Sequence, residues 1–324
     1  IILLTGITLV SARSDDGSSP IPGSTLMGNY LAGRYAQMEG DMRAAAKYLS
    51  AALSLDGENI SLKRRVFLVC LADGQYKKAV DLAKIIISQM PNDQFSLLTL
   101  IAHDFKIGQF VAAREKINKL GADGINSYLN PLLQAWSYVG SQNTASAIKS
   151  LDPLNKTNST LMLYNAHAAL IHTIAGNAQR AEQHFLSLLE TQNGLSLRAT
   201  ELLGAHYEWS GFYEKAIELY DNYNTTDGNY RIIMDLQNRA EQRALSREAF
   251  MTATEGASEA FLDLTGSLRQ QNARETGLLL SRLGLYLKPS FPTFQLMTGT
   301  LLEELGRYKE ANDMYSQIDP ESGY

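Results

Sequence analysis

The sequence of 324 residues contains very little cysteine and no excess of positive charge. Its one cysteine, Cys70, excludes an intramolecular disulfide, so the fold must be stabilised by packing. We interpret Cys70 as a small buried hydrophobe, because it lies four residues before a repeated glycine described below. The formal net charge of -5, without any basic arm, argues against a nucleic-acid partner. With 45% hydrophobic and 19% charged residues, the chain is nevertheless expected to fold.

The sequence also lacks the motifs of common enzymes and metal sites. It has no HExxH, glycine-rich phosphate loop, GxSxG or CxxC pattern. The closest pair of histidines, His167 and His172, lies about 140° apart around a helix and cannot share one metal ion. The basic triplet Lys63-Arg64-Arg65 spreads its charges around a helix and is interpreted as a solvated face. We therefore expect no catalytic residues, no cofactor and no metal.

A repeat organises the chain. The segment Gly40-Asp41-Met42-Arg43-Ala44-Ala45 returns 34 residues later as Gly74 to Ala79 and again as Gly108 to Ala113. A fixed period of this length is typical of stacked helical units. Glycine or asparagine can end a helix in the left-handed conformation without a Cβ clash. The residues expected to make such turns are Gly40, Gly74, Gly108, Gly140, Gly176, Gly211, Asn272 and Gly306.

The spacing of small residues agrees with this repeat. A small residue five positions after each turn predicts an apolar helical stripe where two helices approach closely. These residues are Ala45, Ala79, Ala113, Ala181, Ala216 and Ala311, with Gly277 after Asn272. Pro91 and Pro289 each follow their turn by 17 residues, where the second helix must stop.

This pattern resembles the tetratricopeptide repeat family, whose unit is two antiparallel helices in 34 residues. The resemblance implies an all-α, right-handed α-solenoid of about eight helix-turn-helix repeats, with first helices lining the inner surface. The matching copies are 26–59, 60–93, 94–127, 197–230, 258–291 and 292–324. We expect about six repeats over 26–228, those at 128–194 degenerate, then a non-repeat helical insert at 229–257. Two further repeats at 258–324 are expected to belong to an array that continues beyond the last residue.

The N-terminal region is interpreted as a targeting segment and a tether. Residues 1–12 form an apolar stretch without an initiating Met, and Val10-Ser11-Ala12 has the small residues that a signal peptidase reads. They indicate the remnant of a signal peptide or membrane anchor, with a short buried helix or strand as the alternative. Residues 13–25 predict a flexible linker. The protein is therefore expected to be exported to the bacterial periplasm or anchored facing it, with the cytoplasm as the alternative.

The concave side of the expected array offers an apolar and aromatic surface. Its inward positions are Met27, Tyr30, Arg34, Met38, Arg64, Leu68, Phe95, Leu98, Phe105, Tyr138, Leu163 and Leu170. One hypothesis is a groove that binds a partner peptide or helix. The alternative is that these residues pack against neighbouring helices or against the chain itself.

These observations favour a non-enzymatic protein–protein interaction scaffold or adaptor. Two alternatives are an envelope assembly or chaperone-like factor, and the regulatory repeat region of a larger enzyme such as a glycosyltransferase. Repeat arrays carry many unrelated roles, so the expected fold by itself gives only an analogy for function.

Overall fold

A computed structural model describes residues 22–192, 196–223, 229–245, 251–320 and 322–324. The expected targeting segment 1–12, and residues 13–21 of the expected linker, lie outside these ranges. The described residues form seventeen α-helices and one 3₁₀ helix, and they contain no strand. Within the same ranges, no helix combines the length and the apolar character needed to cross a membrane.

The helices follow one another through short turns. In chain order they are α1 (Leu26–Met38), α2 (Met42–Leu55), α3 (Ile60–Ala72), α4 (Tyr76–Gln89), α5 (Gln94–Lys106), α6 (Phe110–Ile117), α7 (Asn126–Gly140), α8 (Thr144–Ser150), η1 (Asp152–Leu154), α9 (Asn158–Ile174), α10 (Ala178–Gln192), α11 (Leu197–Trp209), α12 (Tyr213–Asp221), α13 (Tyr230–Glu241), α14 (Ala253–Gln270), α15 (Arg274–Leu287), α16 (Pro292–Glu304) and α17 (Tyr308–Tyr315).

The first helices of several repeats begin where the sequence pattern places them. Helices α1, α3, α5 and α11 start at the first residues of the repeats expected at 26, 60, 94 and 197. Each start has a polar N-cap whose side chain accepts a backbone N–H, namely Thr25, Asn59, Asp93 and Ser196. Such caps satisfy one of the free N–H groups at a helix N-terminus.

Seven of the eight residues expected to make left-handed turns have a positive φ, and the prediction for the eighth, Gly140, is wrong. Gly140 is the last residue of α7, and the left-handed residue is Gln142, with φ 56°. Gly140 is small for another reason, because a Cβ there would overlap the ring of Phe110. Counted from Gln142, the intervals to Gly108 and to Gly176 are both 34 residues, and Ala147 falls five residues after the turn and is fully buried. The repeat at 128–155 is therefore in register.

The helices pack as antiparallel pairs. Among the described residues there are eight such pairs, α1 with α2 through α11 with α12, then α14 with α15 and α16 with α17. The alanines five residues after the turns are at most 2% exposed in seven of the eight pairs, and in α14–α15 the residue at this place is the buried Gly277. The fold is thus an all-α solenoid of helix pairs, and close approach at these small residues holds each pair together.

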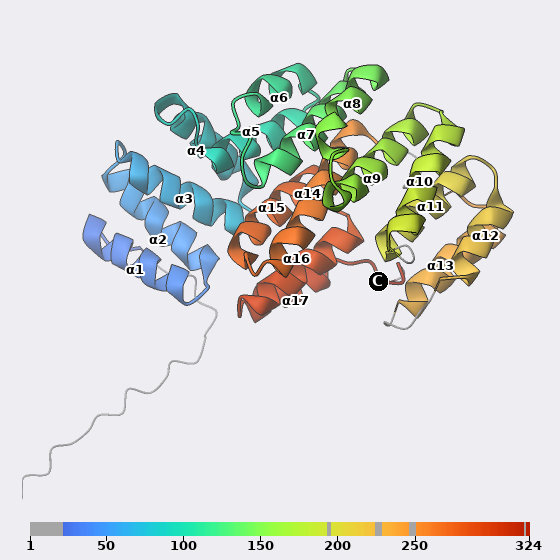
Figure 1. Cartoon of the computed structure of the whole chain (residues 1–324). Coiled ribbons are helices and arrows are strands. Elements are labelled where there is room, and N and C mark those ends of the chain that lie inside the picture. The colour runs from blue at the N-terminus through green and yellow to red at the C-terminus, as the bar shows by residue number, and fades with distance from the viewer. Residues whose placement is uncertain (1–21, 193–195, 224–228, 246–250, 321) are drawn as a thin grey trace, which may run out of the picture.

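The range expected as a non-repeat insert, 229–257, contains helix α13, and the array changes direction after it. Helix α13 packs on α12 at one end of the array. The chain then returns, and α14 packs on α7 in the middle of the molecule (Figure 1). Helix α14 begins at Ala253, five residues before the expected boundary at 258, because Thr252 and Glu255 form a capping box there.

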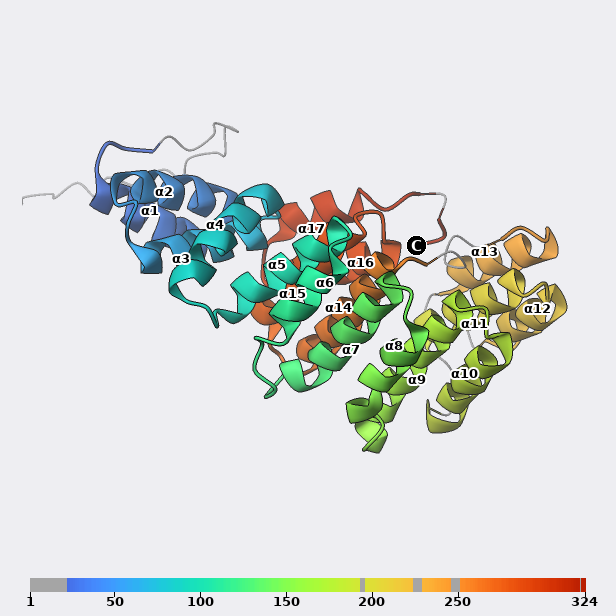
Figure 2. The same cartoon turned by 90° about the horizontal axis from the view of Figure 1, so that it is seen from above.

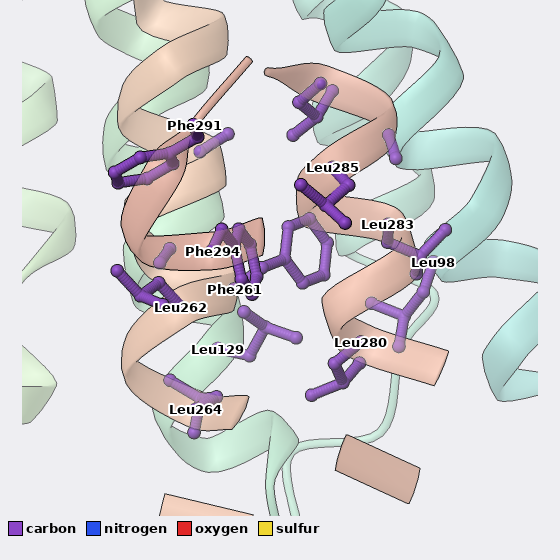
Figure 3. Close-up of a cluster of buried hydrophobic side chains, with 14 of the residues drawn as sticks. Leu98, Leu129, Phe261, Leu262, Leu264, Leu280, Leu283, Leu285, Phe291 and Phe294 are labelled. Atoms are coloured by element: carbon purple, nitrogen blue, oxygen red, sulfur yellow. The ribbon is translucent and has the colours of Figure 1, made fainter. Parts of the chain in front are cut away.

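The returning helices cover the concave side of the array. Helix α15 contacts α3 and α5, while α14 contacts α5, α7 and α9. Seen from above, α14 and α15 lie partly behind α5 and α7, and α16 and α17 lie beside them, between the two ends of the array (Figure 2). The apolar core therefore lies between first helices and the chain's own C-terminal helices, as Figure 3 shows for Leu98, Leu129, Phe261 and Leu283.

Polar contacts also join the two parts. The hydroxyl of Tyr286 on α15 lies 2.9 Å from Nδ1 of His103 on α5. Arg282 donates from Nε to the carbonyl oxygen of Ala72, 3.0 Å away, at the end of α3. A guanidinium there satisfies a free carbonyl and interacts favourably with the negative end of the helix dipole. Burial lowers the pKa of Arg282, and the tyrosine and carboxylates around it favour its charged form.

Candidate functional site

The expected groove residues of the first repeat lie at an open end of the array. Met27 and Met38 are 64% and 78% exposed, while Tyr30 and Arg34 are half-buried. Met27 and Tyr30 line part of a cavity of about 290 Å³ beside α3. These four residues lie near one another on α1.

Arg64 in the second repeat has a partner within the chain. Its guanidinium donates to the carboxylate of Asp93, the N-cap residue of α5. Burial alone would raise the pKa of Asp93, but hydrogen bonds from Arg64 and Ser96 outweigh it and lower the pKa. Arg64 therefore fixes the junction between α3 and α5.

In the middle of the array, the interpretation of an open groove needs correction. Leu98 and Phe105 are fully buried, and Thr254 of α14 donates to the carbonyl oxygen of Phe105 at 2.9 Å. Leu68 and Phe95 are half-buried and pack against the same core. The chain's own C-terminal helices cover this face. For these residues the structure therefore favours the alternative hypothesis, in which they pack against the chain itself.

The remaining three positions lie further along the array. The ring of Tyr138 is half-buried under the guanidinium of Arg114, 4.4 Å from the ring centroid. Leu163 and Leu170 lie on α9 and line a cleft between α9 and α14. The structure thus divides ten of the twelve expected residues among an open end, a covered middle and a cleft, while Arg64 contacts Asp93 and Tyr138 contacts Arg114.

We call this space the α9–α14 cleft, and it has two parts. The outer part has a volume of about 510 Å³, an apolar floor and a polar rim. It is lined by Gly124, Ile125, Ser127, Tyr128, Leu163, Leu264, Ser267, Leu268 and Gln271. The inner part has a volume of about 140 Å³ and reaches between α9, α10 and α11. Leu163 belongs to both parts, and α14 forms one wall of each.

The inner part combines an apolar lining with charged groups at one wall. The apolar residues are Met162, Leu163, Ala166, Leu170, Phe185, Leu188, Ala199 and Leu202. The polar residues are His167, Ser196, Arg198, Glu259 and Asp263. Such a combination of apolar walls and a few polar groups is typical of binding pockets in proteins.

A chain of hydrogen bonds positions Asp263. Trp136 on α7 donates from Nε1 to Nδ1 of His167 on α9, 2.8 Å away. Because Nδ1 accepts, the proton of this imidazole lies on Nε2, which donates to Oδ2 of Asp263 at 3.0 Å. Trp136 and His167 are buried, whereas the side chain of Asp263 is 37% exposed. The carboxylate therefore faces the cleft from a fixed support.

Arg198 is held by two glutamates. Its guanidinium donates to Glu201 at 3.0 Å on the same helix and to Glu259 on α14. The guanidinium also lies over the ring of Phe291, 4.6 Å from its centroid. The hydroxyl of Tyr324 donates to Glu201 from the end of the chain. This cluster joins α11, α14 and the last residue.

Three histidines lie among the helices α9, α10 and α11. The rings of His172 and His184 are stacked with centroids 5.6 Å apart, and Nδ1 of His206 lies 3.0 Å from the hydroxyl of Thr173. Burial lowers the pKa of all three histidines, and the nearby His184 lowers that of His172 further. Phe185, whose ring lies 5.7 Å from that of His206, connects them to the cleft.

Other chemistry-bearing groups do not form a site within the described ranges. No three His, Cys, Asp or Glu side chains there are placed to hold a metal ion. Burial raises the pKa of the Cys70 thiol to about 11, which suppresses the reactive thiolate.

Sequence reasoning found only Leu163 and Leu170 among the lining residues of the cleft, and it missed Tyr128, Arg198, Glu259, Asp263 and Leu268 among others. One signal was present, because Glu259 and Asp263 are four residues apart and share one face of a largely apolar helix. Pairing that face with α9 needs the return of the chain, which the repeat pattern does not indicate.

Comparison with known proteins bears on the fold. No protein-family model matches this sequence, and no curated protein matches it. The structure is similar to a tetratricopeptide repeat protein from Parabacteroides merdae, with a TM-score of 0.53, 16% identity, and coverage of 81% of this chain and 100% of that chain. It is also similar to the apo form of the quorum sensor NprR from B. thuringiensis, with a TM-score of 0.44, 13% identity, and coverage of 89% and 84%. The first similarity shows a tetratricopeptide-type fold.

Proposed function

We propose that this tetratricopeptide-type solenoid is a non-enzymatic scaffold that holds a segment of a partner protein in the α9–α14 cleft. The observation that carries the proposal is the outer part of the cleft, with about 510 Å³ and an apolar floor of Ile125, Leu163, Leu264 and Leu268. Burial of an apolar floor by a ligand contributes affinity, and polar groups at the rim fix the orientation of the ligand. Tyr128, 40% exposed, adds an aromatic anchor of the kind that dominates protein interfaces.

The charge of the cleft specifies the partner segment further. Arg198 is formally matched by one of its two glutamates, and Asp263 adds another carboxylate at the same wall. We infer a segment with apolar residues and a positive charge, because a negative segment would be repelled at this wall. The partner lies beside α14, since α14 and α15 themselves fill the middle of the concave side.

We also propose that the protein acts outside the bacterial cytoplasm, exported to the periplasm or tethered to a membrane by its N-terminus. The support is the apolar composition of residues 1–12 and the small residues at 10–12. Fractionation of cells that express the complete reading frame, with sequencing of the mature N-terminus, tests this location. Recovery in the cytoplasm with residues 1–12 intact would contradict it.

Site-specific photo-crosslinking tests the binding cleft. A benzophenone amino acid placed at Tyr128 is expected to crosslink to a defined partner in the native cell. The same group at Tyr308, which is 68% exposed on α17 and outside the cleft, is the matched control and is expected not to. Equal crosslinking at both positions, or none at Tyr128, would refute the proposal.

Two variants sharpen the test. Leu268→Asp places a charge on the apolar floor, and Ser267→Tyr fills the cleft from its rim. Both are expected to abolish the crosslink from Tyr128 while the helical circular dichroism stays unchanged. If Leu268→Asp reduces the stability of the protein, Ser267→Tyr still tests the cleft. An undiminished crosslink in a folded Ser267→Tyr protein would contradict binding in this cleft.

A further inference from the structure

The inner part of the α9–α14 cleft carries an unmatched negative charge. Among its lining residues, Arg198 contributes one positive charge, while Glu259 and Asp263 contribute two negative charges, so the formal net charge is -1. Arg198 is held by Glu259 and by Glu201. Within the part of the chain that the structure describes, Asp263 accepts a hydrogen bond only from His167, and no lysine or arginine pairs with it. A group that enters the cleft can therefore reach Oδ1 of this carboxylate.

The space in front of this carboxylate is narrow and apolar. Its volume of about 140 Å³ is close to that of an apolar cavity that holds a benzene-sized molecule, about 150 Å³. The walls come from Leu163, Ala166 and Leu170 on α9 and from Leu202 on α11. A chain of four or five methylene groups fits such a space and removes its own apolar surface from water.

We propose that the inner part of the α9–α14 cleft is a receptor for an alkylammonium group, the side chain of a lysine in the partner segment. This inference rests on the proposed function for the identity of its occupant. The methylene groups lie against the apolar walls, and the ammonium group donates to Asp263. A long cationic side chain is suited to this arrangement because its stem is apolar and its charge lies at the tip.

The geometry favours lysine over arginine. Arginine binds carboxylates best through two parallel hydrogen bonds to both oxygens. Oδ2 of Asp263 already accepts from His167, so one oxygen is left for a ligand. A single free oxygen suits the point charge of an ammonium group better than the planar fork of a guanidinium. An anionic ligand would face the carboxylates of Glu259 and Asp263, and Arg198, the cation among the lining residues, is bound by Glu201 and Glu259.

The test uses n-pentylammonium as the probe, with n-pentanol and n-pentanoate as controls of the same length. Met162 lines the pocket, so the ¹³C-methyl resonances of methionine report binding in the intact chain. Pentylammonium is expected to shift the Met162 resonance to saturation and to leave Met27 and Met38 on α1 unchanged. Pentanol is expected to bind about tenfold more weakly, which corresponds to about 1.4 kcal/mol, and pentanoate is expected not to bind.

Two variants and one control complete the experiment. Asp263→Asn removes the charge and keeps an oxygen for His167, so the affinity for pentylammonium is expected to fall about tenfold, to that of pentanol. Ala166→Leu fills the pocket and is expected to abolish binding of both. Asp235→Asn, on an exposed carboxylate of α13, is expected to change nothing.

The outcomes separate this inference from the proposed function. Equal affinity for amine and alcohol, unchanged amine binding in Asp263→Asn, or amine binding that survives Ala166→Leu would each overturn the alkylammonium receptor. The crosslink from Tyr128 reports the outer part of the cleft alone. A protein that binds pentylammonium at Met162 but gives no crosslink from Tyr128 would refute the scaffold and retain the receptor.

Discussion

Gly256 on α14 lies against Trp136 of α7, where the returning helices meet the array. A Cβ at this residue would lie closer than 3.0 Å to three ring atoms of Trp136, which is fully buried on α7. Gly256→Ala therefore requires the ring to move, and the hydrogen bond of 2.8 Å to His167 is lost with it. Overpacking costs about 1–3 kcal/mol, and a buried donor without its partner costs about 1–3 kcal/mol more. Partial relaxation of the helices makes about 2–4 kcal/mol a reasonable expectation.

Gly266 on the same helix provides the matched control. A Cβ there meets no atom within 4 Å, so Gly266→Ala is expected to stabilise α14 by about 0.5–1 kcal/mol through helix propensity. Urea unfolding followed by tryptophan fluorescence and circular dichroism measures both variants. Both variants gain the same helix propensity in α14, so the free energy of unfolding is expected to be lower for Gly256→Ala than for Gly266→Ala by the packing cost of about 2–4 kcal/mol. Two variants of equal stability would refute the packing of α14 on α7.

Three further predictions follow from burial and backbone conformation. Because burial lowers the pKa of His172, His184 and His206, the unfolded chain binds protons more readily than the folded chain. The contribution of these neutral histidines to the free energy of unfolding is fully present above about pH 6.5 and is lost as the pH falls through the folded pKa values. Urea midpoints measured between about pH 7.5 and 5 check this. Gln142→Gly is expected to raise the unfolding free energy by about 1 kcal/mol, since φ is 56° there, and an unchanged or lower melting temperature would contradict the assigned turn. Phe105→Ala is expected to lower the unfolding free energy by about 3–5 kcal/mol in urea titrations, and a loss below about 1 kcal/mol would show that its face is not covered.

The local structure could be predicted from the sequence because it depends on short-range chemistry. Glycine turns, polar N-caps and alanine stripes repeat every 34 residues, and each acts within one helix pair. The turn after α7 was misplaced because Gly140 is small for packing against Phe110, whereas Gln142 makes the left-handed turn. A glycine can serve either purpose, and the sequence does not distinguish them.

The return of the chain could not be predicted from the repeat. The pattern of apolar residues in α5 is the same whether this face contacts a partner or another part of the chain. Leu98 and Phe105 therefore suggested an open groove, although α14 and α15 cover them. Of the expected groove, Leu163 and Leu170 line the cleft, and the binding role of all these residues stays a prediction.

The return of α14 and α15 also has a consequence for biosynthesis. The hydrogen bond from Thr254 to Phe105 joins residues 149 positions apart, and that between His103 and Tyr286 spans 183 positions. An open repeat array can fold progressively as each unit leaves the ribosome. Here, at roughly 5–20 residues per second, synthesis of the intervening residues takes about 7–37 s, and the apolar face of α5 is uncovered during this time. The nascent chain consequently exposes this apolar face until α14 and α15 are made, and these later helices determine when α5 is protected from aggregation.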